Sequence, residues 1–178
     1  MKPIYAFNSS KELITIYQVD KNFRDKYSCI NCNGILIPKK GKIRAHHFAH
    51  KAESNCSYET YLHKVAKLKF YEQYNQCLNH QQPFYFEKDV TTTCISCSNV
   101  KTYNTMCDLG TTIKPFDLTK VYDKVYIEKQ KDGFVADILL VSTSYRIHLF
   151  IEFVVTHFCE QSKIDSGNSI IEIKLNSE

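Results

Sequence analysis

Two acidic residues interrupt apolar, strand-like runs in the C-terminal half of the chain. Asp137 lies within residues 134–141 and Glu152 lies within residues 148–157. An ionised carboxylate in an apolar strand is costly unless a cation or a hydrogen-bond donor binds it. Two such acids on successive strands predict a divalent metal site, and a metal held in this way is suited to the hydrolysis of phosphodiesters.

A helix-like run upstream carries Glu59, His63 and Lys67 at four-residue spacing. Residues four apart share one broad helix face, so a carboxylate, an imidazole and an ammonium could contribute to the same site. The same spacing is typical of ion pairs on a solvated helix face, and Asp137 and Glu152 could equally be edge-strand acids that reach water. Three carboxylates in this order nevertheless favour a nuclease-like arrangement.

The chain contains eight Cys residues. Disulfides would be expected in a secreted protein, but no export signal is evident, so we consider metal binding instead. Cys29 and Cys32 have the spacing of a metal-binding knuckle, which supplies two of the four ligands that tetrahedral Zn²⁺ needs. We expect His50 and Cys56 to complete a structural zinc site. The main alternative places His47 in the ligand set.

A second knuckle is formed by Cys94 and Cys97, and Cys107 provides a third thiol. Cys77 or His80 could supply a fourth ligand. A set of reduced, packed thiols accounts for this pattern as well as a second zinc does.

The elements that must position these residues can be read from hydrophobic spacing and turn signals. Residues 4–20 and 34–44 each predict a β-hairpin, the second with a basic turn. Ser57 is the expected N-cap of a helix from about Tyr58 to Leu78. Residues 83–92 predict a strand, and the chain from Val121 predicts three strands, a short polar helix and a last strand. This order predicts an α/β fold with a mixed sheet.

The chain of 178 residues suits one ordinary domain and a small appended module. We expect a β-rich zinc module at 1–57 and an α/β core at 58–178, with a Cys-containing insert at about 93–110. The net charge of +4 permits binding to nucleic acid without establishing it. No apolar run approaches membrane-spanning length and no signal peptide is evident, so the expected location is the cytoplasm, without a membrane partner.

The run from Tyr27 to Lys67 resembles the competence protein CoiA-like family. It combines a Tyr-x-Cys-x-x-Cys element, a Lys-x-Gly turn, the sequence HFAH at 47–50 and the pattern E-T-x-x-H-x-x-x-K that starts at Glu59. The two strands with their acids extend the resemblance to about residue 157. The HFAH and E-T-x-x-H-x-x-x-K elements are its most specific parts.

The resemblance implies a restriction-endonuclease-like core of the PD-(D/E)XK type, flanked by helices, and an action on DNA. It assigns Asp137 and Glu152 to metal binding and Glu59 to the acid on the preceding helix. In the general motif a Lys lies two residues beyond the strand Glu, and Val154 stands there in this chain. Lys67 or a second metal could replace that Lys, and its absence is also compatible with lost catalysis.

The sequence thus predicts a DNA nuclease that depends on Mg²⁺ or Mn²⁺ and carries structural Zn²⁺. In this interpretation Asp137, Glu152 and Glu59 hold the catalytic metal, and His63 or Lys67 orients the water or the phosphate. An inactive zinc-containing protein that binds nucleic acid is the alternative, and a purely structural zinc protein is a third interpretation. A homodimer is compatible with the sequence.

Overall fold

The computed structural model describes residues 2–20, 26–93, 108–156 and 158–176. The second knuckle, with Cys94, Cys97 and Cys107, lies outside the described residues, as does most of the predicted insert at 93–110. The described part is a mixed α/β structure, mostly strands with two helices and a short 3-10 turn.

An antiparallel sheet of five strands forms the N-terminal part, in the order β2-β1-β3-β4-β5. The strands are β1 (Tyr5–Phe7), β2 (Leu13–Thr15), β3 (Tyr27–Ser28), β4 (Ile35–Lys39) and β5 (His47–His50). The first predicted hairpin is confirmed by the pairing of β1 with β2. The second prediction ended too early, at residue 44, because the strand that pairs with β4 is the HFAH segment itself.

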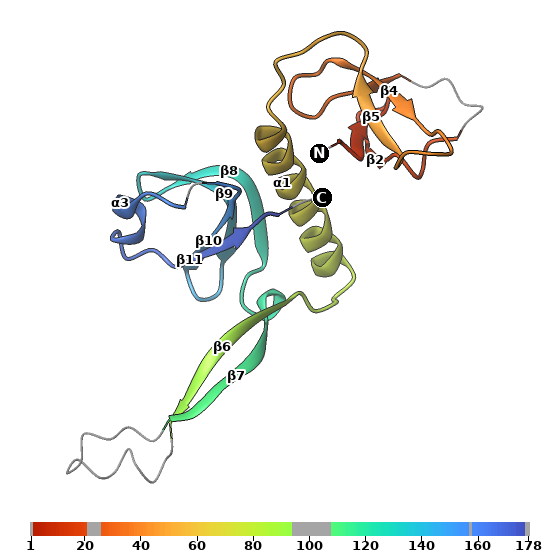
Figure 1. Cartoon of the computed structure of the whole chain (residues 1–178). Helices are drawn as coiled ribbons and strands as arrows, with labels where there is room; N and C mark the ends of the chain where they lie inside the picture. Colours follow the sequence, from red (N-terminus) through yellow and green to blue (C-terminus); the bar gives the residue numbers. More distant parts are fainter. Residues whose placement is uncertain (1, 21–25, 94–107, 157, 177–178) are drawn as a thin grey trace, which may run out of the picture.

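Helix α1 (Tyr58–Asn79) connects the two main sheets, and its predicted N-cap is confirmed, since the Ser57 hydroxyl accepts a hydrogen bond from Thr60 N–H. The two sheets lie on opposite sides of this helix (Figure 1). Tyr61 and Val65 are buried in the N-terminal core, whereas Phe70 and Tyr74 pack in the core of the C-terminal sheet. A helix with apolar contacts on two sides does not show one simple hydrophobic stripe.

A two-stranded ribbon follows the helix and extends away from both sheets (Figure 1). It pairs β6 (Tyr85–Thr93) with β7 (Asp108–Asp117), and the 3-10 turn Leu118–Lys120 leads from it into the C-terminal sheet. The strand predicted at 83–92 corresponds to β6. Within the described ranges, no helix is both long and apolar enough to span a membrane.

The C-terminal sheet has the order β11-β10-β9-β8 and is mixed, because β11 runs parallel to β10 while the other pairs are antiparallel. Its elements are β8 (Lys124–Lys131), β9 (Phe134–Ser142), β10 (Ile147–Val154), helix α3 (Gln161–Ile164) and β11 (Ile170–Lys174). This is the predicted order of elements. One face packs against α1 through Ile138, Leu140 and Ile151, which are fully buried.

Candidate functional site

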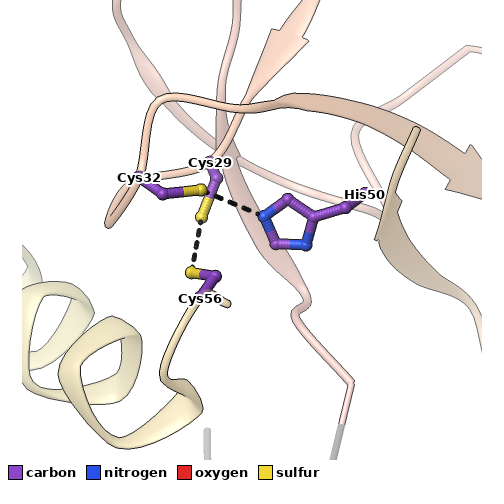
Figure 2. Close-up of side chains that lie close together, drawn as sticks. All are labelled: Cys29, Cys32, His50 and Cys56. Carbon is purple, nitrogen blue, oxygen red and sulfur yellow. Dashed lines mark hydrogen bonds between the residues drawn. The ribbon is translucent and has the colours of Figure 1, made fainter. Parts of the chain in front are cut away.

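The four residues predicted to bind zinc lie together between the N-terminal sheet and the start of α1. Their ligand atoms all lie within 4.8 Å of one another, and they form the sole group of three or more His, Cys, Asp or Glu ligands at that spacing in the described residues. Figure 2 shows the side chains of Cys29, Cys32, His50 and Cys56 converging from three segments. Cys29 Sγ is 3.6 Å from Cys56 Sγ, and Cys32 Sγ is 3.2 Å from His50 Nε2.

These separations fit zinc. Ligands about 2.1–2.3 Å from a tetrahedral Zn²⁺ lie about 3.6–3.8 Å apart. The Cys29–Cys56 distance lies in this range, and the Cys32–His50 distance would lengthen slightly around a metal. Three thiols and one imidazole are also the donor set of a closed structural site. The cluster could therefore bind Zn²⁺.

The knuckle turn arises from its own backbone. Cys29 N–H donates to Gly34 O at 2.8 Å, and Asn33 adopts a positive φ of 58°, which Asn tolerates better than most residues. The N–H groups of Asn31 and Gly34 point at the sulfurs of Cys29 and Cys32, each at 3.4 Å. Such donors stabilise thiolates, so the turn prepares both sulfurs for a cation.

Limited space, rather than its backbone angles, favours glycine at residue 34. A Cβ at this position would lie 3.2 Å from Cys32 Sγ and 3.3 Å from His50 Cδ2. A side chain at residue 34 would therefore push against two of the four ligands.

The local environment shifts the pKa values of the two knuckle thiols, Cys29 and Cys32, in opposite directions. Burial raises the pKa of Cys29 to about 11. Burial also acts to raise the pKa of Cys32, but the Gly34 N–H and the neighbouring thiols hold that pKa below its usual value. Because a metal binds the thiolate, a cation must displace a proton from Cys29, and metal affinity should rise with pH.

His50 joins the cluster because of the register of β5. His50 pairs with Leu36, near the knuckle, whereas His47 pairs with Lys39 at the other end of the strand. Three residues of strand separate the two imidazoles by about 10 Å. His47 Nδ1 instead lies 2.9 Å from the carbonyl oxygen of Ala45.

Asp137 and Glu152 come together where β9 and β10 separate. The pairing of these strands ends at Ile138 and Ile151, which are the sequence neighbours of Asp137 and Glu152. Asp137 Oδ2 then accepts a hydrogen bond from Phe153 N–H at 3.0 Å, and Glu152 Oε1 lies 3.4 Å from Asp137 N. The carboxylates thus occupy hydrogen-bonding positions that the diverging strands leave open.

Both acids line a cavity of about 430 Å³. Its walls come from α1, the start of β9, the end of β10 and the segment that contains α3; the lining residues include His63, Asp137, Glu152, Val154, Cys159 and Lys163. Burial raises the pKa of Glu152, the Lys163 ammonium opposes this rise and the charge of Asp137 adds to it. The cavity thus contains one buried and one half-buried carboxylate, each in contact with a basic side chain.

Two side chains of α1, His63 and Lys67, contact Asp137 of β9. His63 Nε2 lies 3.5 Å from Asp137 Oδ2 and also contacts the carbonyl oxygen of Phe153. Lys67 Nζ lies 3.4 Å from Asp137 Oδ1 and 2.6 Å from Glu128 Oε1. Of these two, His63 lines the cavity and Lys67 does not.

Glu59 lies beside this site rather than within it. Its Oε1 accepts a hydrogen bond from the Thr156 hydroxyl at 2.5 Å, and it is not part of the cavity lining in the described chain. It also does not form a compact ligand group with Asp137 and Glu152 among the residues that the structure describes.

Lys163 is the site residue that sequence reasoning missed. It lies on α3, is buried, and places Nζ 2.8 Å from Glu152 Oε1 and 2.7 Å from the carbonyl oxygen of Val135. No hydrophobic stripe or motif marks it in the sequence. The available indication was its position on the polar helix that immediately follows the strand of Glu152.

The donor chemistry of the cavity fits a hard divalent cation. Two adjacent carboxylates supply oxygen ligands, and Mg²⁺ commonly uses one or two carboxylates and completes its shell with water and phosphate oxygens. Lys163 and Lys67 balance the charges of Glu152 and Asp137.

Residues 11–59 match the family model of the competence protein CoiA N-terminal domain. This match supports the CoiA family. The matched stretch contains all four zinc-cluster residues and ends at Glu59, so the C-terminal sheet with Asp137 and Glu152 lies outside it. Searches of curated proteins and of solved structures gave no significant match.

The region that matches the CoiA model and the cavity with Asp137 and Glu152 therefore lie in different parts of the chain. The match covers the knuckle and the beginning of α1, whereas the cavity depends on β9, β10 and α3. Helix α1 joins them, because His63 lies one turn beyond the end of the matched region and contacts Asp137.

Proposed function

We propose that this CoiA-like protein hydrolyses DNA phosphodiester bonds with the help of Mg²⁺ or Mn²⁺. The observation that carries the proposal is the pair of acids, Asp137 and Glu152, on adjacent strands at one cavity. The cavity also contains an imidazole and an ammonium, which are groups that can orient water or phosphate. The restriction-endonuclease-like class of the core belongs to the same proposal.

In this proposal Asp137 and Glu152 hold the cation. When bound, a divalent cation lowers the pKa of a bound water and neutralises charge on the phosphate. Phe153 N–H holds Asp137 Oδ2 at 3.0 Å and thereby fixes the direction of that carboxylate. His63 contacts the same oxygen and positions it from the side of α1.

DNA is proposed as the substrate because two features support it. Residues 11–59 match a domain of a competence protein, and the turn between β4 and β5 is basic. Lys39, Lys40, Lys42 and Arg44 surround a depression of about 690 Å³ in that turn. Such a group of cations attracts phosphate backbones independently of base sequence.

The direct test is cleavage of single- and double-stranded DNA by the purified zinc-loaded protein, with Mg²⁺, with Mn²⁺ and with neither. Asp137→Asn and Glu152→Gln should reduce the cleavage rate by about 10²-fold or more, because each removes a charge that holds the cation. Asp89→Asn is the matched control, since Asp89 is an exposed acid on the β6–β7 ribbon. Absence of cleavage by the wild-type protein with either metal would refute the proposal.

Binding to nucleic acid without hydrolysis is the second candidate function. It is favoured by Val154, which leaves the strand position two residues beyond Glu152 without an ammonium. DNA binding that is equally strong in Asp137→Asn and Glu152→Gln, without cleavage by any variant, would select this alternative. A salt-dependent loss of affinity in Lys42→Ala would then place the binding on the basic turn.

A further inference from the structure

Lys163 is a buried cation that no role assigned so far explains. Its side chain is 11% exposed, and its Nζ contacts Glu152, the Val135 carbonyl and, at 5.2 Å, the ring of Phe150. Burial of an ammonium costs several kcal/mol unless it is paired. Replacement of a buried ion pair by apolar side chains is often neutral or stabilising, so stability by itself does not account for this pair.

Lys163 supplies an ammonium close to the strand position at which Val154 replaces the Lys of the general motif. Residues two apart on a strand share a face, so Val154 lies on the same face as Glu152 and lines the same cavity. An ammonium at residue 154 would project beside Glu152. Lys163 supplies an ammonium next to Glu152 from α3, on the other wall of that cavity.

Lys67 is less suited to this position. Its Nζ contacts Asp137 and Glu128 on the α1 side, and within the described chain it does not line the cavity. The pairing of Lys67 with Glu128 at 2.6 Å satisfies its charge outside the cavity. Lys163 is therefore the better placed ammonium for a phosphate beside Glu152.

We propose that Lys163 is a catalytic residue that donates a hydrogen bond to a non-bridging oxygen of the scissile phosphate, in place of a Lys at position 154. This inference rests on the proposed nuclease function. As a water oxygen bonds to phosphorus, the P–O bond to the leaving nucleoside breaks. One water proton passes to solvent and the leaving oxygen takes a proton from solvent. Lys163 keeps its proton and stabilises the charge that develops on the phosphate.

The test compares Lys163→Met, Lys163→Arg and the double variant Val154→Lys, Lys163→Met in the zinc-loaded full chain. Removal of one donor to a developing anion typically costs about 10²–10³-fold in kcat. We expect that loss in Lys163→Met, with DNA affinity within about twofold of wild type, and partial recovery in Lys163→Arg. The double variant should regain part of the rate, because it returns an ammonium to the strand.

Lys69→Met is the matched control, since Lys69 makes an exposed ion pair with Glu72 on α1. Thermal unfolding identifies variants that fail to fold. If Lys163→Met does not fold, the cleavage rate of Lys163→Arg tests the role of Lys163 instead. Cleavage by Lys163→Met within about threefold of wild type would refute the role of Lys163 and leave the nuclease function intact. Absence of cleavage by wild type would refute both, so the two failures are distinguishable.

Discussion

The side-chain amide of Asn31 donates to Cys56 Sγ at 3.4 Å and to the carbonyl oxygen of Ser57 at 3.3 Å. Asn31 therefore ties Cys56, a member of the Cys/His cluster, to the residue that caps α1. Lys64, near the start of that helix, also contacts Asn31: its Nζ donates a hydrogen bond to Asn31 O at 3.2 Å. The zinc cluster and the beginning of the helix that carries His63 form one hydrogen-bonded unit.

Zinc content provides the simplest prediction. Purified protein should retain about one Zn²⁺ per chain through dialysis, and Cys29→Ser with Cys32→Ser should abolish it and lower solubility, because structural zinc contributes folding free energy. Cys159→Ser is the control, since Cys159 lies outside the cluster. Elemental analysis measures the ratio. A folded wild-type protein without zinc would contradict the prediction, and a ratio near two would indicate a second site.

Removal of zinc should also loosen the start of α1. The contacts of Asn31 and Lys64 depend on the knuckle, so chelation should lower the hydrogen-exchange protection of residues 58–67. Strands β9 and β10 should retain more of their protection, since their buried core lies on the other side of the helix. Exchange followed by mass spectrometry measures both segments. Equal loss of protection in the two regions would indicate global unfolding instead.

A side chain at residue 34 should weaken zinc binding. In Gly34→Ala the new Cβ crowds Cys32 Sγ and His50 Cδ2, so the ligands must move apart and a chelator should remove zinc faster. Gly41→Ala is the matched control, because a Cβ at residue 41 meets no atom within 4 Å. A competition assay with a chromogenic chelator gives the rates. Identical rates in the two variants would show that the knuckle adapts.

Glu152 should make stability depend on pH. Burial raises its pKa in the folded protein above the ordinary value of 4.5, so folding favours the neutral form. Its destabilising effect is absent below the ordinary pKa and appears as pH rises through the folded pKa. The Tm of Glu152→Gln relative to that of the wild-type protein should therefore rise between pH 4 and neutral pH, by about 2–4 °C for each kcal/mol, and the loss of the ion pair with the buried Lys163 works against this rise.

Thermal unfolding of both proteins from pH 4 to 8, without added Mg²⁺ or Mn²⁺, measures this difference. The zinc cluster is the same in both proteins, so its own pH dependence cancels in the comparison. A Tm difference between the two proteins that stays constant over this range would show that Glu152 does not titrate as described.

Lys67 should contribute to stability more than to cleavage. Its ammonium holds the pKa of Glu128 below the ordinary value, so the stabilisation is present above pH 4.5 and lost as pH falls through the lowered folded pKa. Because the Glu128 side chain is 59% exposed, a double-mutant cycle of Lys67→Met and Glu128→Gln should give about 0.2–1 kcal/mol. A loss of cleavage in Lys67→Met as large as in Lys163→Met would assign the phosphate contact to Lys67.

The start of α1 and the order of elements from residue 121 onwards could be predicted from the sequence because these elements have local causes, whereas β7 (Asp108–Asp117) was not predicted. Alternation of apolar and polar residues marks strands, and Ser57 marks the start of α1 through a cap that involves residues three apart. The end of the second hairpin was wrong because the HFAH segment contains three polar or small residues beside Phe48. Its strand conformation comes from pairing with β4, which local preference does not reveal.

The knuckle pair was evident from the sequence alone, since two Cys separated by two residues form one edge of a zinc site in a single turn. The choice between His47 and His50 depended on the register of β4 with β5, a relationship between segments.

The sequence by itself determined which residues could do chemistry, because Asp137 and Glu152 are costly in apolar strands wherever those strands lie. Only the tertiary structure decided which groups surround them. It brought His63 to Asp137 and Lys163 to Glu152, and it left Glu59 beside Thr156. The physical reason is that an ion pair requires a separation in space of a few ångströms, and chain spacing constrains that separation only within one helix or strand.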